Sequence, residues 1–139
     1  MRKIRNQATG PKATAWKNFS RYIRARDCLA TTGGLDYCKC VTCGEIVPAE
    51  RIDAGHMIGS RRAGILFDET IVFGQCIKCN REGGGQYEAY KRIMIERNGE
   101  DWYEEKERHK HEVVQMSDES YRLISKHYLA KYNELVRNA

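Results

Sequence analysis

Cysteine spacing is the feature of this sequence that most directly indicates chemistry. Four of its six cysteines form two Cys-x-x-Cys pairs, Cys40 with Cys43 and Cys76 with Cys79. A two-residue spacer lets both sulfurs of a pair reach one tetrahedral zinc ion from a tight turn. Gly44, directly after the second cysteine, suits the backbone turn of such a knuckle. The sequence therefore predicts a structural zinc ion held by these four thiolates.

Two alternatives accompany this prediction. Cys38 could take the place of Cys40 beside Cys43, although Cys40 has the better spacing. The four cysteines could also form two disulfides, but a chain with no secretory segment is expected in a reducing compartment, where disulfides are rare. Cys28 is interpreted as a small buried hydrophobic residue, and Cys38 either as the same or as a spare ligand.

A zinc ion with four sulfur ligands has no open position, so catalysis must come from residues that the zinc positions. His56 follows the apolar and β-branched residues Ile46, Val47 and Ile52, where a short hairpin could form. Asn80 follows Cys79 immediately, before a helix that is expected to begin near residue 86. The zinc is therefore expected to hold Asn80 in a fixed relation to His56.

The order Cys-x-x-Cys, Gly-His, Cys-x-x-Cys-Asn resembles the zinc-stabilised His-Me finger nucleases, also called HNH or ββα-metal nucleases. It is most similar to phage endonuclease VII and to the phage NinG/Rap recombination nucleases. The likeness to the second group covers roughly residues 16–100. It includes residues 19–28, 54–56, 75–76 and 79–80, and Gly85-Gln86 with Tyr90.

This resemblance implies an α+β fold with a small zinc-stabilised ββα-metal core, flanked by N-terminal and C-terminal helices. It also implies a metal-dependent endodeoxyribonuclease that acts on branched, Holliday-junction-like DNA. His56 would be the general base, and Asn80 would bind or orient a catalytic magnesium or manganese ion.

The chain departs from the nuclease pattern at two positions. Gly55 stands where many of these nucleases carry an aspartate, and Ile71 stands where the family usually has an asparagine. Asp53 is the nearest acid to His56 and is expected to help bind the metal. In a regular strand these two side chains would point to opposite faces unless a bulge at residues 54–55 turned one of them. Asp68 and Glu69 are the other acids within reach along the chain.

Basic residues are concentrated near the N-terminus of a chain whose net charge is +5. Residues 1–27 contain eight lysines and arginines against one acid, which favours a polyanionic partner such as branched or double-stranded DNA. Residues 1–12 are expected to form a flexible basic arm, which is either a disordered end or a contact to the DNA backbone. The predicted DNA-binding residues are Arg5, Lys17, Arg21, Arg24, Arg61 and Arg62.

Three helices are predicted from hydrophobic periodicity. The first spans residues 13–26 and places Lys17, Arg21 and Arg24 away from its apolar face. The second spans residues 86–97 and would be the helix of the ββα core, ended by Asn98-Gly99. The third spans residues 117–136 with an apolar face of Tyr121, Ile124, Tyr128, Tyr132 and Leu135.

At 139 residues the chain fits one domain with a basic arm, a nuclease-like segment over residues 13–99 and a helical extension over residues 100–139. The last helix packs on its own domain or forms a homodimer. Because no apolar run approaches a bilayer span and no signal peptide is evident, we expect a cytoplasmic protein, in the bacterial host if it is phage-encoded. The glycines at 83–85 lack the lysine and serine of a phosphate-binding loop, so no nucleotide cofactor is expected.

A second function from another class stays open. Zinc knuckles with basic arms are common DNA-binding modules, so the chain could be a non-catalytic accessory protein of recombination.

Overall fold

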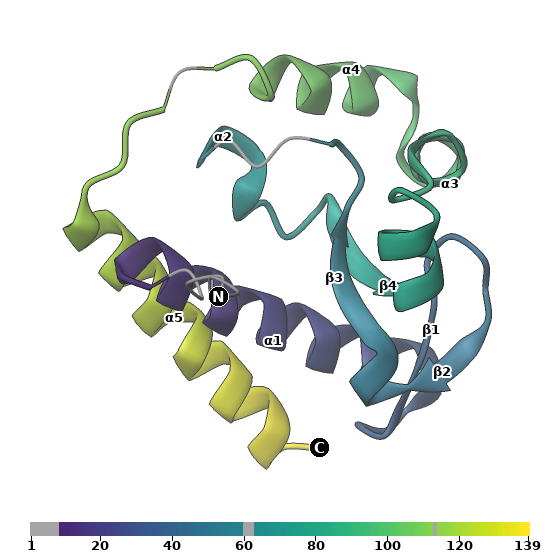
Figure 1. Cartoon of the computed structure of the whole chain (residues 1–139), viewed down its shortest axis with the longest axis horizontal. Helices are drawn as coiled ribbons and strands as arrows, with labels where there is room; N and C mark the ends of the chain where they lie inside the picture. Colours follow the sequence, from purple (N-terminus) through teal and green to yellow (C-terminus); the bar gives the residue numbers. More distant parts are fainter. Residues whose placement is uncertain (1–8, 60–62, 113) are drawn as a thin grey trace, which may run out of the picture.

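The computed structural model describes residues 9–59, 63–112 and 114–139 of the chain. Two small antiparallel sheets and several helices confirm the predicted α+β class. The elements, in order, are α1 (Pro11–Thr32), β1 (Tyr37–Lys39), β2 (Ile46–Pro48), η1 (Ala49–Arg51), β3 (Ile52–His56), α2 (Ala63–Leu66), β4 (Val72–Cys76), the π-helical turn η2 (Lys78–Glu82), α3 (Tyr87–Asn98), α4 (Glu100–His109) and α5 (Asp118–Arg137) (Figure 1). None of the helices described is long and apolar enough to cross a membrane.

Helix α1 is longer at both ends than the sequence predicted. Pro11 begins it, which suits proline because the first helical position needs no N–H donor. At the other end the Thr31 hydroxyl donates to the Asp27 carbonyl and Gly33 closes the helix at a φ of 80°. Cys28 therefore lies inside the helix, and residues 11–12 belong to it rather than to the predicted arm. Arg5 and the rest of that arm, residues 1–8, lie outside the described residues.

The strands pair differently from the predicted hairpin before His56. Ile46 and Val47 belong to β2 and pair with β1, whereas Ile52 begins β3 and pairs with β4. Strand β4 begins at Val72. The β3–β4 register runs without interruption from Ile52 opposite Cys76 to His56 opposite Val72, so β3 has no bulge at residues 54–55 that would turn Asp53 or His56.

Helices cover both faces of the β3–β4 sheet. On one face, a side chain added at Gly74 would come within 3.5 Å of Asp27 on α1. On the other face, the Tyr90 hydroxyl of α3 donates a hydrogen bond of 2.7 Å to the carbonyl of Gly55. Helix α4 was not predicted from periodicity. It contacts α2 and α3 and lies at the top of the molecule in Figure 1.

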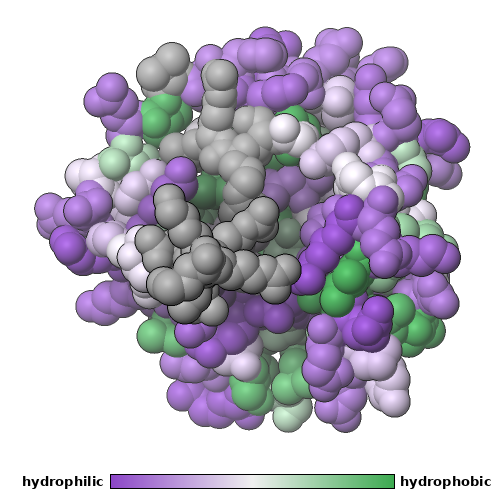
Figure 2. All heavy atoms as spheres, in the orientation of Figure 1, coloured by the Kyte–Doolittle hydropathy of each residue, from purple (hydrophilic) through white to green (hydrophobic). Residues whose placement is uncertain are grey.

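Helix α5 packs along α1, so the predicted apolar face lies within the chain (Figure 1). The Phe19 and Tyr128 rings meet edge to face with centroids 4.8 Å apart. Asn18 donates a 2.7 Å hydrogen bond to the Ser125 hydroxyl beside them. The face of the molecule in Figure 2 is largely hydrophilic, with hydrophobic residues in separated patches. Residues 100–139 therefore share one core with the rest of the described chain.

Arg26 and Asp27 join α1 to β4. Arg26 donates to the carbonyls of Glu69 and Val72 at 2.9 and 2.8 Å and pairs with Asp27 at 2.8 Å. The second Asp27 oxygen accepts the Gly74 N–H at 2.7 Å. The Asp27 side chain is only 8% exposed. Without this carboxylate, the Gly74 N–H and the Arg26 side chain could not form the same hydrogen bonds with water instead.

We expect Asp27→Ala to lower the free energy of unfolding by about 2 to 4 kcal/mol, since it leaves the buried Gly74 N–H without its acceptor and the partly buried Arg26 guanidinium without its carboxylate. Urea unfolding followed by circular dichroism measures the change. Asp36→Ala removes an exposed acid and is the matched control, with an expected loss below about 0.5 kcal/mol. Equal stability of the two variants would show that the Asp27 hydrogen bonds contribute little.

Candidate functional site

The four predicted cysteines come together at one end of the β3–β4 sheet. Their sulfur atoms all lie within 4.8 Å of one another, and the Cys43 and Cys76 sulfurs are 3.9 Å apart. Two sulfurs bound to one tetrahedral zinc at about 2.3 Å are about 3.8 Å apart. The cluster is therefore compatible with a single zinc ion.

Each cysteine pair forms a knuckle for a local reason. Gly44 adopts a φ of 76°, which allows its N–H to reach the Cys40 carbonyl at 3.0 Å. In both pairs the N–H of the second cysteine points at the first sulfur, at 3.5 Å for Cys43 to Cys40 and 3.4 Å for Cys79 to Cys76. The first knuckle is the turn between β1 and β2, and the second joins β4 to η2.

The protein environment lowers the pKa of only one of the four thiols, that of Cys40. Burial raises the pKa of Cys43, Cys76 and Cys79. Burial acts in the same direction on Cys40, but hydrogen bonds from the backbone of Cys43 and Cys76 outweigh it and lower the pKa of Cys40 to about 6. A dication at the centre of the cluster would supply the charge that the other three thiolates require.

Cys38 is not part of this cluster. Its partner across the hairpin is Val47, and this register turns the Cys38 side chain towards α1, where it is fully buried near Thr31. Burial raises its pKa to about 12, as expected for a packed thiol rather than a ligand. Of the two alternatives for the first pair, the structure supports Cys40 with Cys43. All six cysteines are free thiols.

Asp53 and Asn80 lie side by side, although 26 residues separate them along the chain (residues 54–79). The Asn80 amide donates to Asp53 Oδ2 at 3.0 Å. Arg81, the next residue in η2, donates to both Asp53 oxygens at 2.9 Å each. Asp53 thus accepts three hydrogen bonds from η2, and the second knuckle fixes where η2 begins.

A pocket of about 320 Å³ opens beside this group at the edge of β3. Helix α1 forms one wall and the residues around Asp53 form the other. Its lining residues are Trp16, Ser20, Arg24, Asp53, Ala54, Asn80 and Arg81. The lining is mostly polar and contains two arginines, so it suits an anionic ligand.

His56 lies at the far end of β3, where it contacts Leu66 and Trp16. Its Nε2 atom lies 3.0 Å from the Leu66 carbonyl oxygen, and its ring stacks on Trp16 with centroids 5.1 Å apart and planes 21° from parallel. A carbonyl can only accept, so Nε2 is the donor in this hydrogen bond. His56 does not line the pocket of Asp53 and Asn80, but Trp16 does. The indole therefore connects the histidine to the pocket.

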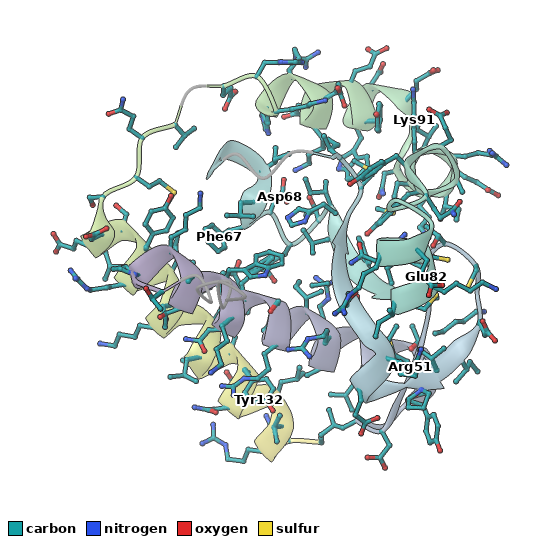
Figure 3. The ribbon with its side chains drawn as sticks, viewed as in Figure 1. Arg51, Phe67, Asp68, Glu82, Lys91 and Tyr132 are labelled. Atoms are coloured by element: carbon teal, nitrogen blue, oxygen red, sulfur yellow. The ribbon has the colours of Figure 1, made fainter. Side chains whose placement is uncertain are left out.

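Neither alternative acid lies near Asn80. Asp68 accepts from Lys106 of α4 at 2.9 Å, and Glu69 accepts from Tyr128 and Lys131 of α5 at 3.0 Å. In Figure 3, Asp68 is well separated from Glu82, which lies in the same turn as Asn80. These two acids hold helices in place, which leaves Asp53 as the acid beside Asn80.

Both departures from the nuclease pattern have a structural reason. A side chain at position 55 would overlap Gln75, whose Cβ would be only 2.8 Å away, so glycine is required while Gln75 is present. Ile71 is fully buried in the main core, where an asparagine would lose apolar contacts. Position 55 therefore cannot supply the acid, and Asp53 is the nearest replacement.

The predicted DNA-binding residues have different locations. Arg24 lines the pocket and Lys17 is exposed on α1. Arg21 lies over the Tyr132 ring of α5 at 4.3 Å, and Figure 3 shows Tyr132 on α5 beside α1. Arg61 and Arg62 lie outside the described residues.

Two residues of the site, Trp16 and Arg81, were not predicted. The contact of Trp16 with His56 depends on how α1 crosses the sheet. Arg81 could have been noticed because it follows Asn80 directly, but its pairing with Asp53 joins segments far apart in sequence.

We expect Cys76→Ser to remove the bound zinc and the cooperative thermal transition, because the binding energy of a structural zinc is folding energy. Metal content by mass spectrometry and melting by circular dichroism measure this. Cys28→Ser is the matched control, since Cys28 is also buried but lies outside the cluster, and it should retain about one zinc per chain. A Cys76→Ser protein that melts like the unmodified chain would contradict a structural role.

The known proteins that this chain resembles belong to one phage family. The family model described as "Bacteriophage Lambda NinG protein" matches residues 2–138. Protein ninG of Escherichia phage 933W is 30% identical over 138 residues, covering 96% of this chain and 64% of the relative. Protein ninG of Salmonella phage P22 is 32% identical over 102 residues, covering 70% of this chain and 46% of the relative.

The chain thus spans less than two thirds of the length of these curated relatives. No solved structure matches it. Because the family model covers nearly the whole sequence, the chain belongs to the family of the bacteriophage lambda NinG protein.

Proposed function

We propose that this chain is a metal-dependent, structure-specific DNA endonuclease. The observation that carries the proposal is the position of His56 at the end of the first strand of the β3–β4 pair, where a hydrogen bond between Nε2 and the Leu66 carbonyl orients its ring. Its substrate class, branched or Holliday-junction-like recombination intermediates, rests on the likeness to the NinG/Rap recombination nucleases.

The arrangement of elements supports a ββα-metal core. Strands β3 and β4 pair in antiparallel fashion, η2 and α3 follow, and His56 lies on the first strand. In this proposal the four-cysteine cluster binds a structural zinc that fixes the second knuckle, and with it Asn80, against β3.

Asp53 and Asn80 have the donors that a magnesium or manganese ion requires. Both offer an oxygen, and magnesium usually takes one or two carboxylates while keeping several waters. The Asn80 Nδ2 and Asp53 Oδ2 atoms are 3.0 Å apart, so the two side chains are adjacent, and both line a polar pocket that leaves room for such waters. A bound dication would supply positive charge to the phosphate during cleavage.

His56 would carry out the proton transfer. Its imidazole takes a proton from a water molecule, and the water oxygen forms a bond to phosphorus. The bond from phosphorus to the 3′ oxygen breaks, and that oxygen takes a proton from solvent, which leaves a 5′ phosphate and a 3′ hydroxyl. The imidazolium is stabilised by the Leu66 carbonyl and by the Trp16 ring until it returns its proton to solvent.

Basic residues would hold the DNA backbone around this pocket. Arg24 lines the pocket and Lys17 is exposed on the same helix. Arg5, Arg61 and Arg62 belong to this proposal from the sequence alone. These contacts bind phosphate, so they give affinity without reading base sequence.

A homodimer is part of the proposal because a junction-cutting enzyme must place two active sites on one substrate. The inner face of α5 already packs on α1, so a dimer through this helix would use its outer side. Leu123, Leu129 and Val136 are the large exposed hydrophobic residues of α5.

One observation favours the second candidate, a non-catalytic DNA-binding accessory protein. Arg81 occupies both oxygens of Asp53 and neutralises the acid that would bind the catalytic metal. In this alternative the zinc-folded domain binds DNA through its basic residues and performs no cleavage.

Cleavage assays on a four-way junction with magnesium or manganese separate the two candidates. We expect His56→Ala to reduce the cleavage rate by about 10² to 10⁴, the usual contribution of general base catalysis, while zinc content and junction affinity change little. His109→Ala, at a histidine remote from the pocket, is the control and should cleave normally. An unmodified protein that cuts neither junctions nor plasmid DNA would favour the accessory protein.

Substitutions at Asn80 distinguish between two roles of this residue, as a ligand of the catalytic metal or as the residue that begins the following helical turn. We expect Asn80→Ala to lose cleavage while retaining zinc, fold and junction binding. Asn80→Asp keeps an oxygen ligand and should retain part of the cleavage at a lower optimal metal concentration. Both variants are compared by titrating manganese in the junction assay. Cleavage by Asn80→Ala at the unmodified rate would assign the metal to other residues.

A further inference from the structure

Arg81 covers the acid of the proposed metal site from the solvent side. Its Nε and Nη2 atoms each donate to a different Asp53 oxygen at 2.9 Å. The Arg81 side chain is 64% exposed, whereas that of Asp53 is 18% exposed. The carboxylate is therefore the fixed, inner member of this pair, and the guanidinium is the member that can leave.

We propose that Arg81 is a displaceable counter-ion: it neutralises Asp53 until a divalent cation takes its place, and the released guanidinium then binds a DNA phosphate at the pocket. This inference rests on the proposed function, because it concerns the metal and the substrate of the same site.

Arg81 and a divalent cation would compete for the same Asp53 oxygens. Arg81 approaches both Asp53 oxygens, and Asn80 donates a further hydrogen bond to Oδ2. A dication that binds Asp53 needs the same oxygen lone pairs and would repel the guanidinium charge. Asn80 would also have to rotate its amide so that Oδ1, and not Nδ2, faces the metal beside the carboxylate. The metal cannot bind Asp53 with Arg81 in its present position.

Displacement of Arg81 requires little reorganisation of the fold. Exposed ion pairs contribute little to stability because water solvates both partners after they separate. Asp53 lies on β3, and Asn80 and Arg81 lie on η2, whose start is tied to the cysteine cluster. The exposed end of Arg81 has to move away and the Asn80 amide has to turn, while the backbone of β3 and η2 stays in place.

The released guanidinium remains beside the position where DNA would bind. Arg81 and Arg24 line the same pocket from opposite walls, and Arg24 is held by a 3.2 Å hydrogen bond from its Nε to the Ser20 carbonyl. A guanidinium binds phosphate oxygens through two parallel hydrogen bonds, as it now binds the carboxylate. Metal binding would thus create a DNA contact, and the two ligands should strengthen each other's binding.

Manganese binding to the zinc-loaded chain of 139 residues, measured by electron paramagnetic resonance without DNA, tests the first half of the inference. Arg81→Gln should bind manganese about tenfold more tightly than the unmodified protein, within the usual range of coupled sites. Arg51→Gln is the matched control, because it removes one exposed positive charge two residues from Asp53 and should leave the affinity within about twofold. Asp53→Asn should abolish the binding in both backgrounds.

Junction binding in a His56→Ala background, which avoids cleavage, tests the second half. With Arg81 present, manganese should raise junction affinity; with Arg81→Gln, this increase should disappear while zinc content is unchanged. Equal manganese affinity of Arg81→Gln and the unmodified chain would overturn the inference, as would binding that survives Asp53→Asn. A protein that shows the Arg81 effects but cuts no junction would overturn the nuclease proposal and leave this inference standing.

Discussion

The convergence of four cysteine sulfurs is the constraint on which the rest of this structure depends. The β1–β2 hairpin and the β3–β4 pair are each two-stranded, and such small sheets are marginal alone in water. The cluster joins the turn of the first sheet to the end of β4 and the start of η2. It thereby places Asn80 and Arg81 against Asp53. These residues are too far apart in the sequence for a local interaction to bring them together.

Helix α1 supplies the second half of the framework. Through Arg26 and Asp27 it fixes β4, and through Trp16 it holds the His56 ring. The same helix contributes Ser20 and Arg24 to the pocket beside Asp53. One long helix thus aligns the histidine, the acid and a basic wall, and α5 prevents it from moving by packing along its other side.

The sequence predicted those features that depend on local chemistry. Cysteine spacing identified the cluster, because two-residue spacers and a following glycine are requirements of the knuckle itself. Periodicity found α3 and α5 to within a residue or two, since capping by Gly99 and Ser117 is also local. It missed α4, whose exposed, charge-rich turns have little apolar pattern. The pairing of Arg81 with Asp53 and the stacking of Trp16 on His56 depend on tertiary arrangement and could not be read from spacing.

The close packing of Gly55 against Gln75 couples the residue types that these two positions can carry. Gln75 uses the space beside Gly55 to donate to Thr42 in the first knuckle and to the Gly85 carbonyl before α3, at 3.1 and 2.7 Å. A lineage that gains an acid at position 55 must therefore shorten position 75 and lose this connection. Among relatives, an aspartate before the histidine should co-occur with a small residue at 75, and Asp53 should then be free to vary. The two arrangements are alternative solutions for placing one acid beside Asn80, and a single substitution cannot convert one into the other.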